Sequence, residues 1–162
     1  TGLGGYAGHS HKYKKKGGSG YLFRTSTVQD FSGVTGACLL VKTAVYDEMH
    51  GLDEQFAVAF NDVDFCLRVR DAGYRIAWTP YAELIHYESK SRGGDEKDPL
   101  KAARFAAEQQ RLYTIHGKEN ILDDPYYNPN LTRDREDFSE SDDLRRLKEG
   151  RVTVRFRGGT LQ

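Results

Sequence analysis

The sequence is poor in cysteine, in net charge and in long apolar runs. Its 162 residues include two cysteines, Cys38 and Cys66. Both lie in apolar segments, so we expect buried thiols in a reducing compartment and not a disulfide scaffold. Lysine plus arginine and aspartate plus glutamate are equal at 24 each, so no net field attracts nucleic acid or an acidic membrane surface. No apolar run is long enough to span a bilayer.

What the sequence does contain is sufficient for one folded domain. Hydrophobic residues make up 38% of the chain, and a chain of this length can bury a substantial core. Residues 1–20 are glycine-rich and basic and are expected to form a loop. The chain begins with Thr1 inside this segment, which suggests a piece of a longer protein.

The clearest predicted helix begins at Asn61, a good N-cap residue, and stops at Gly73. Its first turn carries Asp62 and Asp64, where the helix dipole favours anions. The residues expected on its buried face are Phe65, Cys66, Val69 and Ala72.

Two further helices and several strands are predicted around this helix. One helix covers residues 42–50, and the other runs from Pro99 to His116, between the start signal of Asp98 and the stop signal of Gly117. A buried strand is predicted over residues 34–41. The remaining predictions are strands over 21–23, 74–78, 81–87 and 151–156, and a charged helical tail over 136–148.

Asp62 is the candidate for acid–base chemistry. Asp62 and Asp64 are two positions apart on a helix, so their side chains leave in directions about 200° apart and do not form a chelating pair. We expect Asp64 to reach back to the Asn61 amide, as the acid of a capping box does. Asp62 is then free to face a cleft and to act as a general base for a bound hydroxyl. The alternative is an exposed first-turn anion, because the helix N-terminus stabilises the carboxylate and weakens it as a base.

His86 and Gly36 are the other candidate site residues. His86 precedes a polar, basic loop suited to phosphate contacts, which suggests a ligand site; the alternative is a hydrogen-bonded core histidine. One histidine and separated acids do not complete a metal coordination sphere. Gly36 would let a ligand approach the backbone, unless it only serves packing or a bulge. We assign no chemistry to His116 and place Glu108 on the polar face of its helix.

Five segments carry a resemblance to a known family through their order and spacing over about residues 34–92. They are Val34–Val41, Gly51–Phe56, Asn61–Arg68, Ala72–Ile76 and Pro80–His86. Together they resemble the family 2 glycosyltransferases, inverting enzymes with the GT-A fold, and most closely a bacterial rhamnosyltransferase-like branch that assembles cell-surface polysaccharides.

The resemblance implies an α/β fold, the C-terminal portion of a GT-A (Rossmann-like) glycosyltransferase fold, with a mixed sheet and flanking helices. It divides the chain into a glycine-rich basic lead-in (1–33), an acceptor-side catalytic half (34–118) and a C-terminal extension (119–162). Residues 124–130 resemble the region beyond the core in the same branch. The nucleotide-binding N-terminal half of the family has no counterpart in residues 1–33, so we expect the isolated chain to be inactive.

The resemblance also implies roles for residues. Asp62 falls at the catalytic base and His86 at a metal ligand, and the metal of the full-length enzyme would be Mg or Mn. The substrate-binding residues would be Thr35, Gly36, Asn61 and Arg92. Asn61 departs from the acid that the family usually carries before its base.

The implied reaction transfers a sugar, with inversion, from a nucleotide-diphospho-sugar to an acceptor hydroxyl. The acceptor would be a saccharide or a lipid-linked saccharide, with no nucleic-acid partner. The implied location is cytoplasmic, including a peripheral position at the inner face of the membrane. Apolar surface exposed by a missing half would also favour a homo-oligomer.

Two other functions stay open at this point. The first is a non-catalytic carbohydrate-binding or interaction module. The second is a metal-dependent phosphohydrolase using Asp62, Asp64 and His86, which the divergence of the two acids on the helix disfavours.

Overall fold

The computed structural model describes residues 3–11, 15, 17–86, 98–141, 154–156 and 159–161. Five predictions fall at least partly outside them: the loop over 1–20, the substrate contact of Arg92, the end of the 81–87 strand, most of the 136–148 helix and the start of the 151–156 strand. The described elements are mixed α and β, with two antiparallel sheets of two strands each. This arrangement is compatible with part of a glycosyltransferase-like fold.

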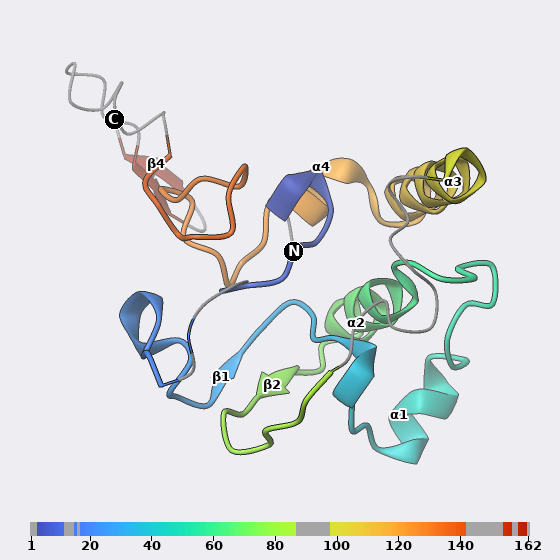
Figure 1. Ribbon diagram of the computed structural model, residues 1–162, viewed down its shortest axis with the longest axis horizontal. Coiled ribbons are helices and arrows are strands. Elements are labelled where there is room, and N and C mark those ends of the chain that lie inside the picture. Colours follow the sequence, from blue (N-terminus) through green and yellow to red (C-terminus); the bar gives the residue numbers. More distant parts are fainter. Residues whose placement is uncertain are drawn as a thin grey trace.

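The longer helices lie in the middle of the chain (Figure 1). They are α1 (Thr43–Glu48), α2 (Asn61–Asp71), α3 (Pro99–His116) and α4 (Lys118–Leu122). None of the described helices has the length and apolar character that crossing a membrane requires.

Among the described residues, the short elements are three 3-10 helices and four strands. The 3-10 helices are η1 (Leu3–Gly5), η2 (Tyr21–Phe23) and η3 (Gly36–Cys38). The strands are β1 (Gln29–Asp30), β2 (Ala77–Trp78), β3 (Val154–Phe156) and β4 (Gly159–Leu161). In the first sheet Gln29 of β1 is opposite Trp78 of β2, and in the second β3 pairs with β4.

The three predicted helices are confirmed, and their ends follow from local signals. Asp98 accepts a hydrogen bond from the backbone N–H of Leu100 (3.0 Å) at the start of α3, and Gly117 ends that helix with a φ of 74°. After α2, Gly73 adopts a φ of 88°, the left-handed region that glycine enters without strain.

The main core lies between α2, α3 and α4. Its fully buried members are Leu67 of α2, Leu112 of α3 and Ile121 of α4, packed with Phe56 and Phe60 before α2. η1 also contacts α4, so the N-terminal segment reaches this core (Figure 1). The buried face predicted for α2 is right for Phe65, Cys66 and Val69, but wrong for Ala72, which is exposed.

A second, smaller core forms in the C-terminal segment. Tyr127, Leu131 and Phe138 are buried together, and Tyr21 packs against them. The Tyr21 and Phe138 rings stack with centroids 5.4 Å apart. Residues 21–23, predicted as a strand, are the 3-10 helix η2. The strand prediction was wrong because Tyr21 is held here by an aromatic contact with a distant segment and not by a neighbouring strand.

The strand predicted over 34–41 was also wrong. This segment contains η3, and Leu40 is 98% exposed. No strand forms over 81–86 either, where Tyr81, Leu84 and Ile85 are exposed. A strand requires a partner for its backbone N–H and C=O groups. The 74–78 and 151–156 predictions are confirmed only in part, as β2 and β3.

The cysteine prediction is half right. Cys66 is buried, but Cys38 is exposed in η3, and both are free thiols. Burial raises the pKa of the Cys66 thiol. The hydrogen bond to the Val34 carbonyl lowers this pKa, but by less than burial raises it.

Candidate functional site

A cavity of about 840 Å³ lies at the N-terminal end of α2. Its wall includes Asp62 in the first turn of α2 and Thr35 just before η3. Other walls come from Gly4 and residues 6–9 at the N-terminus, Phe105 of α3, and residues 133–137 beyond the main core. The volume falls within the range of about 300–1,000 Å³ typical of small-molecule sites.

The carboxylate of Asp62 is held by two backbone N–H groups. The N–H of Gly36 donates to Oδ2 (2.7 Å) and the N–H of Val63 donates to Oδ1 (2.8 Å). A Cβ on residue 36 would lie only 3.2 Å from the Cβ of Asp62. The group that approaches the Gly36 backbone is therefore the Asp62 side chain.

Three predicted site residues thus come together. Thr35 lines the cavity beside Asp62, and its hydroxyl accepts a hydrogen bond from the Ala37 N–H (3.3 Å), which starts η3. Thr35 and Gly36 approach α2 through this turn and not through the predicted strand. Their substrate-binding roles stay predictions.

Asn61 organises the start of α2. Its Oδ1 accepts a hydrogen bond from the N–H of Asp62 (2.8 Å). Asn61 is the first helical residue, and the N-cap position belongs to Phe60, which has a left-handed φ of 66°. The N-cap predicted at Asn61 was wrong by one residue, because the chain enters the helix at Phe60.

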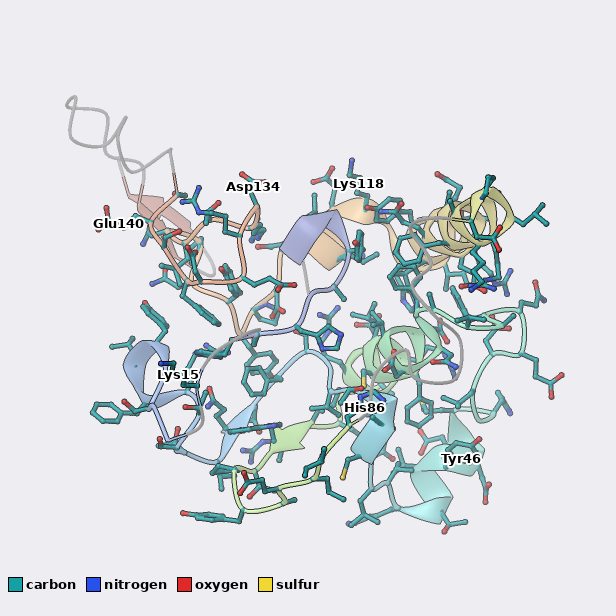
Figure 2. All side chains as sticks on the ribbon, in the orientation of Figure 1. Lys15, Tyr46, His86, Lys118, Asp134 and Glu140 are labelled. Atoms are coloured by element: carbon teal, nitrogen blue, oxygen red, sulfur yellow. The ribbon has the colours of Figure 1, made fainter. Side chains whose placement is uncertain are left out.

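His86 is exposed at the end of a described segment. Figure 2 labels its side chain. Within the part of the chain that the structure describes, no three His, Cys, Asp or Glu side chains gather as a metal site. The role of His86 as a ligand stays a prediction.

Asp64 has a different environment from Asp62. It is 1% exposed. Its Oδ1 lies 2.8 Å from Nε2 of His116, and its Oδ2 accepts hydrogen bonds from Nε (2.9 Å) and Nη2 (2.7 Å) of Arg68. Burial alone would raise the pKa of Asp64, but the hydrogen bonds with His116 and Arg68 outweigh burial and hold this pKa below its ordinary value.

The predicted capping-box role of Asp64 was therefore wrong. Its carboxylate faces the core, where it joins α2 to the end of α3. Arg68 extends the connection to the end of α1 by donating to the carbonyls of Met49 and Gly51 (2.9 Å to Gly51). A carboxylate engaged in this way is not available as a metal ligand, which removes the basis of the phosphohydrolase alternative.

Glu108 was also misplaced by sequence reasoning. It is 5% exposed and not on a polar helix face. Its carboxylate accepts hydrogen bonds from the backbone N–H groups of Val58 (3.2 Å) and Ala59 (2.8 Å). Glu108 therefore fixes the loop that leads into α2 and, through it, the position of Asp62. Its partners are about fifty positions away, so no local pattern reveals this contact.

Three aromatic residues from distant segments meet at the cavity. Tyr6, Phe60 and Phe105 all line it. The ring centroids are 5.3 Å apart for Tyr6–Phe60, 5.6 Å for Tyr6–Phe105 and 5.0 Å for Phe60–Phe105. Tyr6 was missed because it stands alone in a glycine-rich segment that carries no periodic signal.

The sequence was compared with family models, solved structures and curated proteins. No family model and no solved structure matches the chain. Uncharacterized protein y4gI of Sinorhizobium fredii is 47% identical over 85% of this chain and 15% of that protein. O-antigen biosynthesis protein RfbC of Myxococcus xanthus is 32% identical over 82% of this chain and 10% of that protein. N-acetylglucosaminyl-diphospho-decaprenol L-rhamnosyltransferase of Mycobacterium tuberculosis is 33% identical over 43% of this chain and 22% of that protein.

The chain spans less than a quarter of the length of each of these relatives. The names of the second and third relatives suggest a glycosyltransferase-like family with a role in polysaccharide synthesis. The resemblance noted in the sequence is supported at this level.

Proposed function

We propose that this chain is the acceptor-side part of an inverting family 2 glycosyltransferase with the GT-A fold, and that Asp62 is its general base. One observation carries the proposal. The Asp62 carboxylate lines a cavity at the start of α2 and is oriented there by the N–H of Gly36. The names of two relatives support the reaction class.

In the proposed reaction an acceptor hydroxyl attacks the anomeric carbon of a nucleotide-diphospho-sugar. A new C–O bond forms as the bond to the diphosphate breaks, and the leaving diphosphate takes the bonding electrons. Asp62 accepts the proton of the attacking hydroxyl. The hydrogen bond from Gly36 fixes the orientation of the base, which favours a reactive geometry. A single displacement inverts the anomeric configuration.

The proposal assigns donor binding to parts of the polypeptide outside this chain and further contacts to residues near Asp62 and to Arg92. The donor-binding elements are supplied by other parts of the polypeptide, so the isolated chain is inactive. Arg92 contacts substrate, as do Thr35 and Asn61. A divalent metal, Mg or Mn, would neutralise charge on the diphosphate, with His86 as one ligand. Because the described residues do not form a coordination sphere, we derive no step through the metal.

The acceptor and the location complete the proposal. One relative is named for a lipid-linked saccharide substrate, and we propose a saccharide or lipid-linked saccharide acceptor for this chain. The enzyme would then work in the cytoplasm, including at the inner face of the membrane where such acceptors are held.

The test is the substitution Asp62→Asn in the full natural polypeptide. We expect kcat for sugar transfer to fall by about 10²–10⁴-fold, with donor binding retained. The matched control is Asp71→Asn, since Asp71 is an exposed anion of the same helix that pairs with Arg70. Undiminished turnover of the Asp62→Asn protein would remove Asp62 from the role of base.

The second candidate is a non-catalytic carbohydrate-binding module. It is favoured by the aromatic and polar lining of the cavity, a combination suited to sugar rings and hydroxyls. Saccharide binding by the full natural polypeptide without turnover of any nucleotide-sugar would select this candidate over the enzyme.

A further inference from the structure

The 3-10 helix η2 presents two large apolar side chains to solvent. Leu22 is 75% exposed and Phe23 is 65% exposed. Both residues have a left-handed φ, of 46° and 59°, which is unfavourable for a residue with a Cβ. Figure 1 shows η2, drawn in blue, at the outer edge of the molecule and apart from α2 and α3. We call Leu22 and Phe23 the apolar pair.

The residues on either side of the apolar pair are held by the fold. Tyr21 packs against the second core. The guanidinium of Arg24 donates to the carbonyl of Tyr126 (3.1 Å), and the N–H of Arg24 donates to the carbonyl of Tyr21 (3.0 Å) across the turn. Because both flanking residues are anchored, the turn between them keeps the apolar pair in solvent and in one defined arrangement.

The charges of the chain balance overall but not along its length. Residues 1–29 contain no aspartate or glutamate, so all 24 acids of the chain follow them. Of the lysines in this segment, Lys15 is described, and it is exposed. The apolar pair therefore lies in a basic stretch that is free of acids. The basic residues of the stretch are Lys12, Lys14, Lys15, Lys16 and Arg24.

Acids from the C-terminal segment contact the N-terminal part of the chain, and they have partners there. The carboxylate of Glu136 accepts a hydrogen bond from the N–H of His9 (3.3 Å). The carboxylate of Asp124 is buried and accepts a hydrogen bond from the hydroxyl of Ser32 (2.6 Å). Both carboxylates are therefore engaged within the fold.

An exposed apolar pair in a basic stretch fits the surface of a membrane that contains anionic lipids. Apolar side chains enter the boundary between the headgroups and the acyl chains, and lysines near an anionic surface are attracted to it. A soluble polyanion would contact the lysines and leave the apolar pair in water. An uncharged partner would make no use of the lysines.

We propose that Lys15, Leu22 and Phe23 form a docking surface for an anionic membrane, with the apolar pair inserted at the interface. The inference rests on the proposed function for the location of the enzyme at a membrane. The binding itself requires neither Asp62 nor sugar transfer.

The experiment measures co-sedimentation of the full natural polypeptide with lipid vesicles. The vesicles are either pure phosphatidylcholine or an equimolar mixture of phosphatidylcholine and phosphatidylglycerol. We expect binding to the anionic mixture, and we expect added salt to weaken it. Leu22→Asn with Phe23→Asn should weaken this binding by at least about 10-fold, because two apolar side chains lose their burial. Lys15→Gln should weaken it by about 5-fold, the effect of one lysine near an anionic surface.

The matched control replaces another adjacent pair of exposed apolar residues. Leu84 and Ile85 are 68% and 79% exposed, but they follow Glu83 and not a run of lysines. Leu84→Asn with Ile85→Asn should leave vesicle binding unchanged.

A thermal melt of each variant separates binding from folding. Asparagine is tolerated in the left-handed region, so Leu22→Asn with Phe23→Asn should melt at or above the temperature of the parent. If this double variant fails to fold, Phe23→Asn alone is measured by the same criterion, and weakened binding is again expected.

Four results would overturn the inference: no binding to the anionic vesicles, equal binding to the two kinds of vesicle, unchanged binding in the variants of the apolar pair, or an equal loss in the control. If Lys15→Gln weakens binding and the variants of the apolar pair do not, the contact is electrostatic alone and the partner is a polyanion.

These results are distinguishable from failure of the proposed function. If Asp62→Asn retains sugar transfer while the parent binds anionic vesicles through the apolar pair, the assignment of the base fails and the docking surface stands. If Asp62→Asn abolishes transfer in a polypeptide that binds no vesicles, the base stands and the docking surface fails.

Discussion

The α2–α3 region differs from the segments 34–41 and 81–86 in whether its apolar side chains are buried. Leu67 of α2 and Leu112 of α3 are fully buried. In the other segments, Leu40, Tyr81 and Ile85 are exposed. Both regions contain apolar runs, and both were predicted to form regular elements. Only the helices formed as expected.

The difference follows from where each element finds its hydrogen-bond partners. A helix pairs its own N–H and C=O groups within a turn, so α2 and α3 need only an apolar surface to pack against. A strand requires a neighbour that is distant in sequence. β1 and β2 meet this requirement over two residues each, while residues 34–41 turn into η3, where Gly36 and Thr35 meet the Asp62 end of α2.

The largest loss of stability should come from removing Asp64, the buried carboxylate that pairs with Arg68 and His116. Asp64→Ala leaves the buried His116 and the half-buried Arg68 without their anion. We expect it to lower the free energy of unfolding by about 3–5 kcal/mol, measured by urea denaturation. Asp71→Ala, at an exposed ion pair on the same helix, should change it by about 0.5 kcal/mol or less. Equal losses in the two variants would contradict the structural role of Asp64.

A direct comparison of the two regions uses one leucine from each. Leu112→Ala removes a fully buried side chain and should cost about 2–5 kcal/mol. Leu40 is 98% exposed, so Leu40→Ala should cost about 0.5 kcal/mol or less in the same chain. A large loss for Leu40→Ala would mean that residues 34–41 are buried in solution and that the contrast is wrong.

The stability that Asp64 contributes should decrease in acid. The folded pKa of Asp64 is held below its ordinary value of 3.8, so its contribution to stability is full above that value and is lost as the pH falls through the lower folded pKa. The difference in unfolding free energy between the parent and Asp64→Asn should therefore narrow below about pH 4. Urea denaturation at several acidic pH values measures it. A difference that stays constant down to about pH 2 would exclude the linkage.

The last prediction concerns the reactivity of the two thiols and involves no change in stability. Cys38 is exposed in η3 and Cys66 is buried in α2, and burial raises the pKa of the Cys66 thiol. Reaction with a thiol reagent under native conditions should modify Cys38 rapidly and Cys66 only after denaturation. Mass mapping of the labelled peptides measures both sites. Rapid native labelling of Cys66 would show that α2 opens readily.

The parts of the structure that depend on neighbouring residues could be predicted from the sequence. The N-terminal turn of α2 with Asp62, and the limits of α3 at Asp98 and Gly117, follow from residues within a few positions of one another. The same reasoning misread Asp64. Its Arg68 partner four residues later was visible as a helical pair, but His116 lies 52 positions away.

The sequence by itself determined α1, α2 and α3, although not α4 or the 3-10 helices, and it determined which acid stands at the start of α2. Tertiary structure decided what those side chains face: Gly36 against Asp62, Glu108 beneath the loop before α2, and Arg133 with Tyr6 in the cavity wall. The physical reason is range. Helix caps and dipoles act within one turn, whereas the partner of a buried charge and the opposite wall of a cavity are chosen by packing between distant segments.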